Sequence, residues 1–478
     1  MDQPIIEAII PTIVIPFAFA SFLFSAAAAF IASLFGIELK TEGPKRLLEV
    51  LLKPKVLGSA LVMNFVIWGG YTGYSYLKNA PNPIFWITHK NKSNQLPENR
   101  DYNDVVTREN TAGNWLAHGQ KIAGFKDQWT IDFATGFFNG VTISGNSAFA
   151  GNKDGYVYEI DTTTGKTLRR FYIGTHVTPA PLVWKGNLYV GEGVHDTHHA
   201  RIYKFSLATG RLIDHFQTSG HTEGSPVIIE SEGKAILLVS AGADGAYGVD
   251  PTSMQKIWHH AVGHVDSGFS SSASVVFFST GVEKESEAKA PRHAFAVNAL
   301  TGRVLWQREL AASSWMPSII VKNEVCFGLG EIYWESRYGQ LACFNRGTGV
   351  PTTTFNLDGA VTSLIDEHNG LLVFADRNGK VYLADIERRK ILWTQETGET
   401  KGPSFASPSF LNDELLVFPT FNQGLFVFDI ATGSIMNTWL PKGWSKVYSR
   451  VVPSTSGWYV TDYGGRIYKF VPQLEPRS

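Results

Sequence analysis

The chain has 478 residues, a formal net charge of −1 and two cysteines, Cys326 and Cys343. The balanced charge gives no reason to expect nucleic acid as a partner, because proteins of that class carry an excess of Lys and Arg. Two cysteines exclude a disulfide framework. They lie in runs that we expect to be neighbouring strands, Glu324 to Leu329 and Gly339 to Phe344, so a cross-strand bridge and two buried free thiols remain alternatives.

Two uncharged apolar runs come first along the chain, Ile9 to Leu34 and Val56 to Leu77. Each is long enough to cross a bilayer as a helix, which takes about 20 residues. The segment Met1 to Glu7 is acidic, whereas a cleaved signal peptide begins with basic residues. We therefore expect residues 1–78 to form two transmembrane α-helices that hold the protein in the lipid bilayer.

The segment between the two runs indicates their orientation. It contains five basic residues, and such loops lie on the cytoplasmic side: Lys40, Lys45, Arg46, Lys53 and Lys55. Both chain ends and everything after the second helix are then expected on the periplasmic side of the inner (cytoplasmic) membrane. Small residues at Ala26 to Ala29 and Gly69 to Gly73 allow close helix packing, either between the two helices or against a partner membrane subunit.

Residues 79–126 have the composition of a linker. Asn79 to Pro83 contains two prolines, and Asn91 to Asn103 is polar. We expect an extended segment that later packs along the following domain.

A β-rich segment then recurs eight times at a spacing of roughly 45 residues. Each copy has two β-rich runs around a Gly-containing turn, followed by a polar turn, most clearly from Asp154 to Lys166. One four-stranded blade cannot bury both of its faces by itself, so this period predicts a propeller. We expect an all-β, eight-bladed β-propeller over residues 127–472, and a tail over residues 473–478.

Two features recur in every complete copy. The polar turn ends in Thr-Gly or a close variant, where Gly supplies a positive φ. A large ring follows in the last strand, which we interpret as a packing device between blades, at Trp129, Phe171, Phe216, Trp258, Trp306, Phe355, Trp393 and Trp439.

The last copy stops after its third strand, near Val471. The missing fourth strand is resembled by Asp127 to Asp132, which carries Trp129 as its ring. We therefore expect this N-terminal strand to complete blade eight beside Arg466 to Phe470, which would remove the free edges of an open ring.

The segment from Asp154 to Lys166, with its ring in the next strand, resembles the PQQ-type repeat. That resemblance covers residues 127–471 and implies an eight-bladed propeller like those of quinoprotein dehydrogenases and of the non-enzymatic BamB scaffold. The enzymes of the family hold the quinone PQQ with adjacent cysteines and a Ca²⁺ ion. Here Cys326 and Cys343 are separated and no match to the calcium ligands is found, so PQQ is not expected.

Three histidines, His176, His221 and His264, begin the inner strand of successive copies. Glu223 and Asp266 follow two residues after the second and third, so they lie on the same face of their strands. Inner strands line the axis of a propeller, and we expect these five residues to rim one mouth of the central channel. More histidines are expected at this mouth, at positions 195, 198, 199, 259 and 260.

Imidazoles with carboxylates are ligands for Zn²⁺, Cu²⁺ or Fe²⁺. The sequence thus indicates a transition metal as cofactor, with His176, His221, His264, Glu223 and Asp266 as candidate ligands. The alternative is that the histidines serve only hydrogen bonding between blades, because repeats reuse one packing solution.

Three functions remain open at this point. The first is a non-catalytic scaffold or accessory subunit of an envelope complex with membrane-protein partners. The second is a quinone- or metal-dependent oxidoreductase with its site at the histidine-rich mouth. The third is a sensor or binder of a small periplasmic ligand. The repeat itself does not decide among them, because propellers host enzymes and scaffolds alike.

Overall fold

The computed structural model describes residues 105–106, 115–194, 197–398 and 404–475. The chain divides into two compact units, Met1–Ile84 and Phe85–Ser478, and the propeller belongs to the second. The two predicted transmembrane helices lie outside the described residues. Within the described ranges, no helix is long and apolar enough to span a bilayer.

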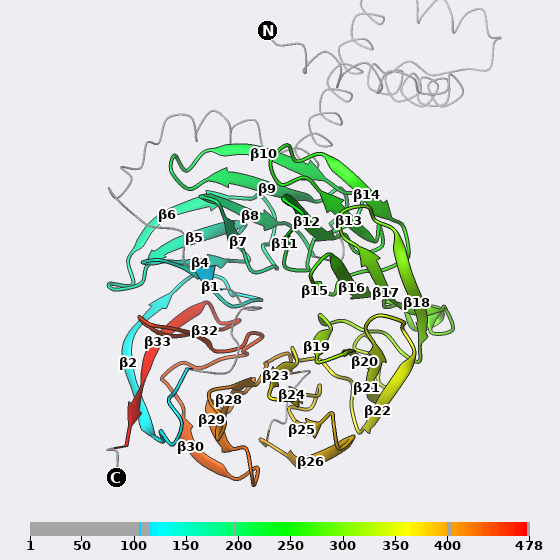
Figure 1. Ribbon diagram of the computed structural model, residues 1–478. Helices are drawn as coiled ribbons and strands as arrows, with labels where there is room; N and C mark the ends of the chain where they lie inside the picture. Colours follow the sequence, from blue (N-terminus) through cyan, green and yellow to red (C-terminus); the bar gives the residue numbers. More distant parts are fainter. Residues whose placement is uncertain (1–104, 107–114, 195–196, 399–403, 476–478) are drawn as a thin grey trace, which may run out of the picture. The chain divides into compact units, whose positions relative to one another are not determined.

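Eight antiparallel sheets are arranged in a ring, which confirms the predicted all-β propeller (Figure 1). From the channel outward, blades one to four consist of β1 (Val105–Val106), β3 (Thr142–Ser144), β4 (Ser147–Gly151), β5 (Tyr156–Asp161) and β6 (Thr167–Tyr172); β7 (Leu182–Trp184), β8 (Asn187–Gly191), β9 (Arg201–Ser206) and β10 (Leu212–Gln217); β11 (Val227–Ser231), β12 (Lys234–Ser240), β13 (Ala246–Val249) and β14 (Lys256–His260); β15 (Ser270–Ser272), β16 (Val275–Ser279), β17 (Arg292–Asn298) and β18 (Val304–Leu310).

Blades five to eight follow the same order. They consist of β19 (Ile319–Val321), β20 (Glu324–Gly330), β21 (Gly339–Asn345) and β22 (Pro351–Leu357); β23 (Asp366–His368), β24 (Leu371–Ala375), β25 (Val381–Asp385) and β26 (Lys390–Gln395); β27 (Ser409–Phe410), β28 (Leu415–Pro419), β29 (Leu425–Asp429) and β30 (Ile435–Trp439); β31 (Val452–Ser454), β32 (Gly457–Thr461), β33 (Arg466–Leu474) and β2 (Ile122–Asp132). A short 3₁₀ helix, η3 (Glu285–Glu287), lies between β16 and β17.

The ring closes as predicted, because β2 pairs antiparallel with β33 as the outermost strand of blade eight. Asp127 lies opposite Phe470 and Asp132 opposite Arg466. The strand starts at Ile122, ahead of the expected start at residue 127, since Phe125 packs against the rings of Trp439 and Phe470.

The middle strands of each blade are buried on both faces because each blade is covered by its two neighbours. All residues of β4 and of β28 are buried, for example. This explains why such strands are continuous apolar runs in the sequence and do not alternate polar and apolar residues.

Tryptophans at the outer strands join one blade to the next, which confirms the interpretation of the rings as packing devices. Each indole N–H donates to a carbonyl oxygen at the polar turn of the following blade: Trp129 to Thr162, Trp258 to Ala299, Trp306 to Arg346 and Trp393 to Ile430. The turn glycine lies under the ring. Gly302 has a φ of +73°, and a Cβ there would lie 2.6 Å from the Cβ of Trp258, so both the backbone and the space require glycine.

Cys326 and Cys343 lie directly opposite each other on β20 and β21 and form a disulfide. Of the two alternatives left open by the sequence, the bridge is the one that the structure contains, and two free thiols is wrong.

Candidate functional site

The mouth of the central channel holds a cavity of about 500 Å³. It is lined by the segments that lead into the inner strands of all eight blades, which confirms that these segments rim one mouth. Residues from five of the blades are used below: Asn139, His176, Glu223, Asp266 and Trp315.

The cavity has two different walls. The wall of blades three to five carries Glu223, Asp266, Trp315 and Tyr333. The wall of blades seven, eight and one is mainly aromatic, with Phe138, Phe405, Tyr448 and Tyr463, and it carries Lys153. The Lys153 ammonium donates a hydrogen bond to the Tyr463 hydroxyl at 2.7 Å. The cavity is therefore acidic on one side and aromatic with one cation on the other.

The structure brings His221, His264 and Asp266 together beside the acidic wall. The Nε2 atom of His221 lies 2.8 Å from one carboxylate oxygen of Asp266, and the Nε2 atom of His264 lies 2.7 Å from the other. Their side chains are 4%, 9% and 9% exposed, respectively for His221, His264 and Asp266. One carboxylate thus bridges histidines from two neighbouring blades.

A fourth residue, Glu283, belongs to the same cluster, with a carboxylate oxygen 3.3 Å from Nε2 of His264. One ligand atom from each of His221, His264, Asp266 and Glu283 can be chosen so that all four lie within 4.8 Å of one another. Sequence reasoning did not single out Glu283. The signal available was its place in the long loop from Gly281 to Arg292, which was expected at this mouth only as a loop.

Backbone pairing positions the cluster. Val265 forms an antiparallel bridge with Gly242, and His264 forms one with Gly281. Gly242 has a φ of +52°, and a Cβ there would lie 2.5 Å from the ring of His221. The glycine is required both by its backbone and by the space that the imidazole occupies.

The electrostatics of the acidic wall follow from this packing. Burial alone would raise the pKa of Asp266, but hydrogen bonds from His221 and His264 hold that pKa below its usual range. Desolvation, together with the charges of Asp266, Glu223 and Glu283, raises the pKa of the Tyr333 hydroxyl. Three carboxylates therefore create a negative potential at this wall.

The remaining predicted residues lie elsewhere. His176 and Glu223 line the cavity but are not in the four-residue cluster. His260 accepts or donates at the Gly302 carbonyl, and His259 stacks on Tyr247, as the blade-packing alternative expects. Histidines 198 and 199 are exposed, and position 195 lies outside the described residues.

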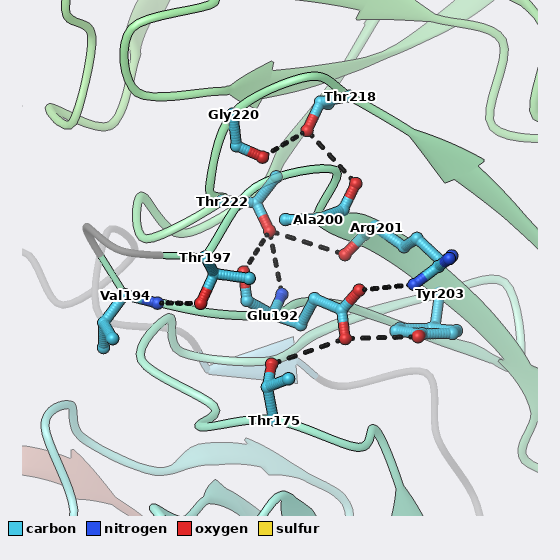
Figure 2. A network of polar contacts seen from close by, with 10 residues as sticks. All are labelled: Thr175, Glu192, Val194, Thr197, Ala200, Arg201, Tyr203, Thr218, Gly220 and Thr222. Carbon is cyan, nitrogen blue, oxygen red and sulfur yellow. Dashed lines mark hydrogen bonds and ion pairs between the residues drawn. The ribbon is translucent and has the colours of Figure 1, made fainter. Parts of the chain in front are cut away.

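A buried polar network in blade two supports the segment between His221 and Glu223 (Figure 2). The Glu192 carboxylate accepts hydrogen bonds from the Arg201 guanidinium at 3.2 Å and the Tyr203 hydroxyl at 3.2 Å. The backbone of Glu192 bonds to Thr222, whose hydroxyl accepts from the Glu192 N–H at 2.8 Å. Burial raises the pKa of Glu192 to about 7, against the opposing effects of Arg201 and Tyr203.

Fold and site together define a PQQ-type eight-bladed propeller with a polar cavity at one mouth of its channel. Residues 123–280 and 292–446 match the model of the family described as outer membrane protein assembly factor BamB. These segments make up more than half of the chain, and the chain belongs to this family.

Known proteins with similar sequence or fold differ in function. Tetrathionate hydrolase of Acidithiobacillus ferrooxidans is 20% identical over 339 residues, which is 62% of this chain and 64% of that protein, somewhat less than two thirds of its length. BamB of Moraxella catarrhalis has a TM-score of 0.56 at 13% identity and covers 73% of this chain and 99% of its own. Quinohemoprotein alcohol dehydrogenase of Comamonas testosteroni has a TM-score of 0.58 at 13% identity, with 74% and 78% covered. At this identity the two structures show the fold alone.

Proposed function

We propose that this propeller binds a small cationic ligand at the mouth of its central channel. The observation that carries the proposal is the acidic wall of the cavity, where Glu223 and Asp266 from neighbouring blades line the same space of about 500 Å³. Small-molecule sites are cavities of roughly 300–1,000 Å³ with a few converging polar groups. The acidic wall has both properties.

Aromatic rings add to the preference for a cation. Trp315 and Tyr333 line the acidic wall and are in edge contact, with ring centroids 5.0 Å apart. A cation over the face of an aromatic ring is stabilised by about 0.5–2 kcal/mol. Carboxylates and rings on one wall therefore act in the same direction.

The same wall does not fit PQQ, which the fold family implies as a cofactor. PQQ carries three carboxylates, and the acidic wall would repel them. Among the described residues that line the cavity, Lys153 is the only Lys or Arg, and it lies on the opposite wall beside Tyr463. No step through the quinone is proposed. Tetrathionate, a dianion, is disfavoured by the same repulsion.

The test uses two probes of opposite charge on the full chain. Isothermal titration should detect binding of tetramethylammonium and none of tetrathionate. Glu223→Gln should weaken tetramethylammonium binding about five- to tenfold, the equivalent of about 1 kcal/mol for one lost charge. Glu287→Gln, a change at an exposed carboxylate outside the cavity, is the matched control. Binding of tetrathionate without tetramethylammonium would overturn the proposal.

A second function, that of a non-catalytic scaffold or accessory subunit of an envelope complex, is favoured by membership in the BamB family. In this proposal residues 1–78 anchor the protein in the inner membrane and contact partner subunits, and the propeller lies in the periplasm. Replacing residues 1–78 by an unrelated two-helix anchor should abolish co-purification of membrane partners in mild detergent. The same partners with either anchor would assign docking to the propeller instead.

A further inference from the structure

We infer that His221, His264, Asp266 and Glu283 form a binding site for one divalent transition-metal ion of the Zn²⁺ type. The inference rests on the proposed function, because it names the cation that the acidic wall binds. The four side chains offer two imidazole nitrogens and two carboxylate oxygens, all within 4.8 Å of one another. Ligands of a tetrahedral Zn²⁺ ion lie about 2.0–2.2 Å from the metal and are therefore roughly 3.3 Å apart.

The hydrogen-bonding capacity of His264 is the first argument. Its Nε2 atom lies 2.7 Å from Asp266 and 3.3 Å from Glu283. An imidazole nitrogen carries at most one hydrogen, so one N–H cannot be directed at both carboxylates. A metal ion bound to this nitrogen can be shared with both carboxylates, because it accepts several ligands at once.

The choice of partners is the second argument. Four other buried carboxylates of the described propeller are paired with arginine, which neutralises a buried charge without a metal: Glu159 with Arg169, Glu192 with Arg201, Glu331 with Arg292, and Asp366 with Arg450. Asp266 and Glu283 are paired with histidines instead. Histidine in place of arginine makes this cluster competent to bind a metal, since arginine is not a metal ligand.

The ligand set selects the kind of ion. Two nitrogen and two oxygen donors suit Zn²⁺ and related transition metals, whereas Ca²⁺ and Mg²⁺ are bound by oxygen alone. The backbone bridges of His264 with Gly281 and of Val265 with Gly242 hold the donors in place before an ion arrives. Asp266 also lines the cavity, so the ion would face the acidic wall beside Glu223.

The test is titration of the chelator-treated full chain with Zn²⁺ and with Co²⁺. We expect one ion per chain, and a visible Co²⁺ spectrum of four-coordinate type. His264→Asn and Glu283→Gln should each weaken Zn²⁺ binding at least about tenfold, as expected when a metal ligand or its support is lost. His176→Ala should leave the affinity unchanged, because His176 is an exposed histidine at the same mouth that lies outside the cluster.

Binding to the unmodified chain decides the question even if a variant does not fold. Absence of Zn²⁺ and Co²⁺ binding there, or equal affinity in folded Glu283→Gln, would overturn the metal site. Tetramethylammonium binding that persists in that case would leave the proposed function standing, whereas loss of both would remove it.

Discussion

The outer and inner ends of the blades use the same repeat in opposite ways. At the outer ends, four blades repeat one contact, in which an indole N–H donates to the turn of the following blade. At the inner ends, the position two residues after the shared histidine changes from blade to blade, from Thr178 to Glu223 to Asp266. Contacts that repeat hold the ring together, and residues that vary create the cavity.

This comparison has a physical basis. Every outer strand meets the same environment, the turn of the next blade, so one solution serves all of them. The inner strands converge on a single space, which each blade approaches from a different direction. Different side chains can therefore gather there without disturbing the packing between blades.

The largest expected effect is at the outer end. Trp306→Ala removes a ring that is 5% exposed and a hydrogen bond to Arg346. It should lower the free energy of unfolding by about 3–5 kcal/mol, the usual cost of truncating a buried aromatic residue. Chemical denaturation measures this, with Leu440→Ala at an exposed position as control. A loss below about 1 kcal/mol would show that the repeated ring does not join the blades.

An intermediate effect is expected at Glu192, which supports the inner end. Its pKa is raised by burial to about 7 in the folded protein. The folded state therefore retains the proton longer than the unfolded state, and this contribution to stability is lost as pH rises from about 4.5 through about 7. The loss is of order 3 kcal/mol, at about 1.4 kcal/mol for each pH unit.

The measurement is the difference in unfolding free energy between the unmodified chain and Glu192→Gln at pH 5 and pH 8. Glutamine keeps an acceptor for Arg201 and Tyr203 but does not titrate, so this part of the pH dependence should vanish. Glu230→Gln, at an exposed side chain, should leave it in place. Identical slopes in Glu192→Gln and the unmodified chain would contradict the assignment.

The smallest effect is expected where a contact belongs to neither end. Lys380 and Asp358 form an ion pair at 2.7 Å in which the aspartate is 78% exposed. Asp358→Asn should change the unfolding free energy by less than about 1 kcal/mol, as for most surface pairs. The change should also shrink as salt is raised to 1 M. A larger, salt-independent loss would show that stability is not concentrated in the repeated contacts.

Much of the fold was predictable because the repeat encodes it locally. The eight blades, the closing strand and the rings all follow from residue patterns that recur at one spacing. The glycine of the turn was predicted from its positive φ alone. That Gly302 also lies under Trp258 was not predictable, because the contact joins two blades and appears in neither copy by itself.

The site was predictable only where it follows the repeat. His221, His264 and Asp266 were expected together since they occupy matching positions in adjacent blades, and the structure confirms their proximity. Their role as metal ligands stays a prediction. Glu283 and the network of Glu192 were missed, because neither occupies a position that the copies share.

The sequence by itself determined the architecture, since strand patterns, turns and blade-joining rings depend on local periodicity that survives in any single copy. Only the tertiary structure decided which side chains share a space at the channel mouth. That outcome depends on how loops of unequal length, such as Gly281 to Arg292, fold back over the inner strands, and no periodic pattern specifies their direction. The pairing of Cys326 with Cys343 was decided in the same way, by the register of β20 against β21.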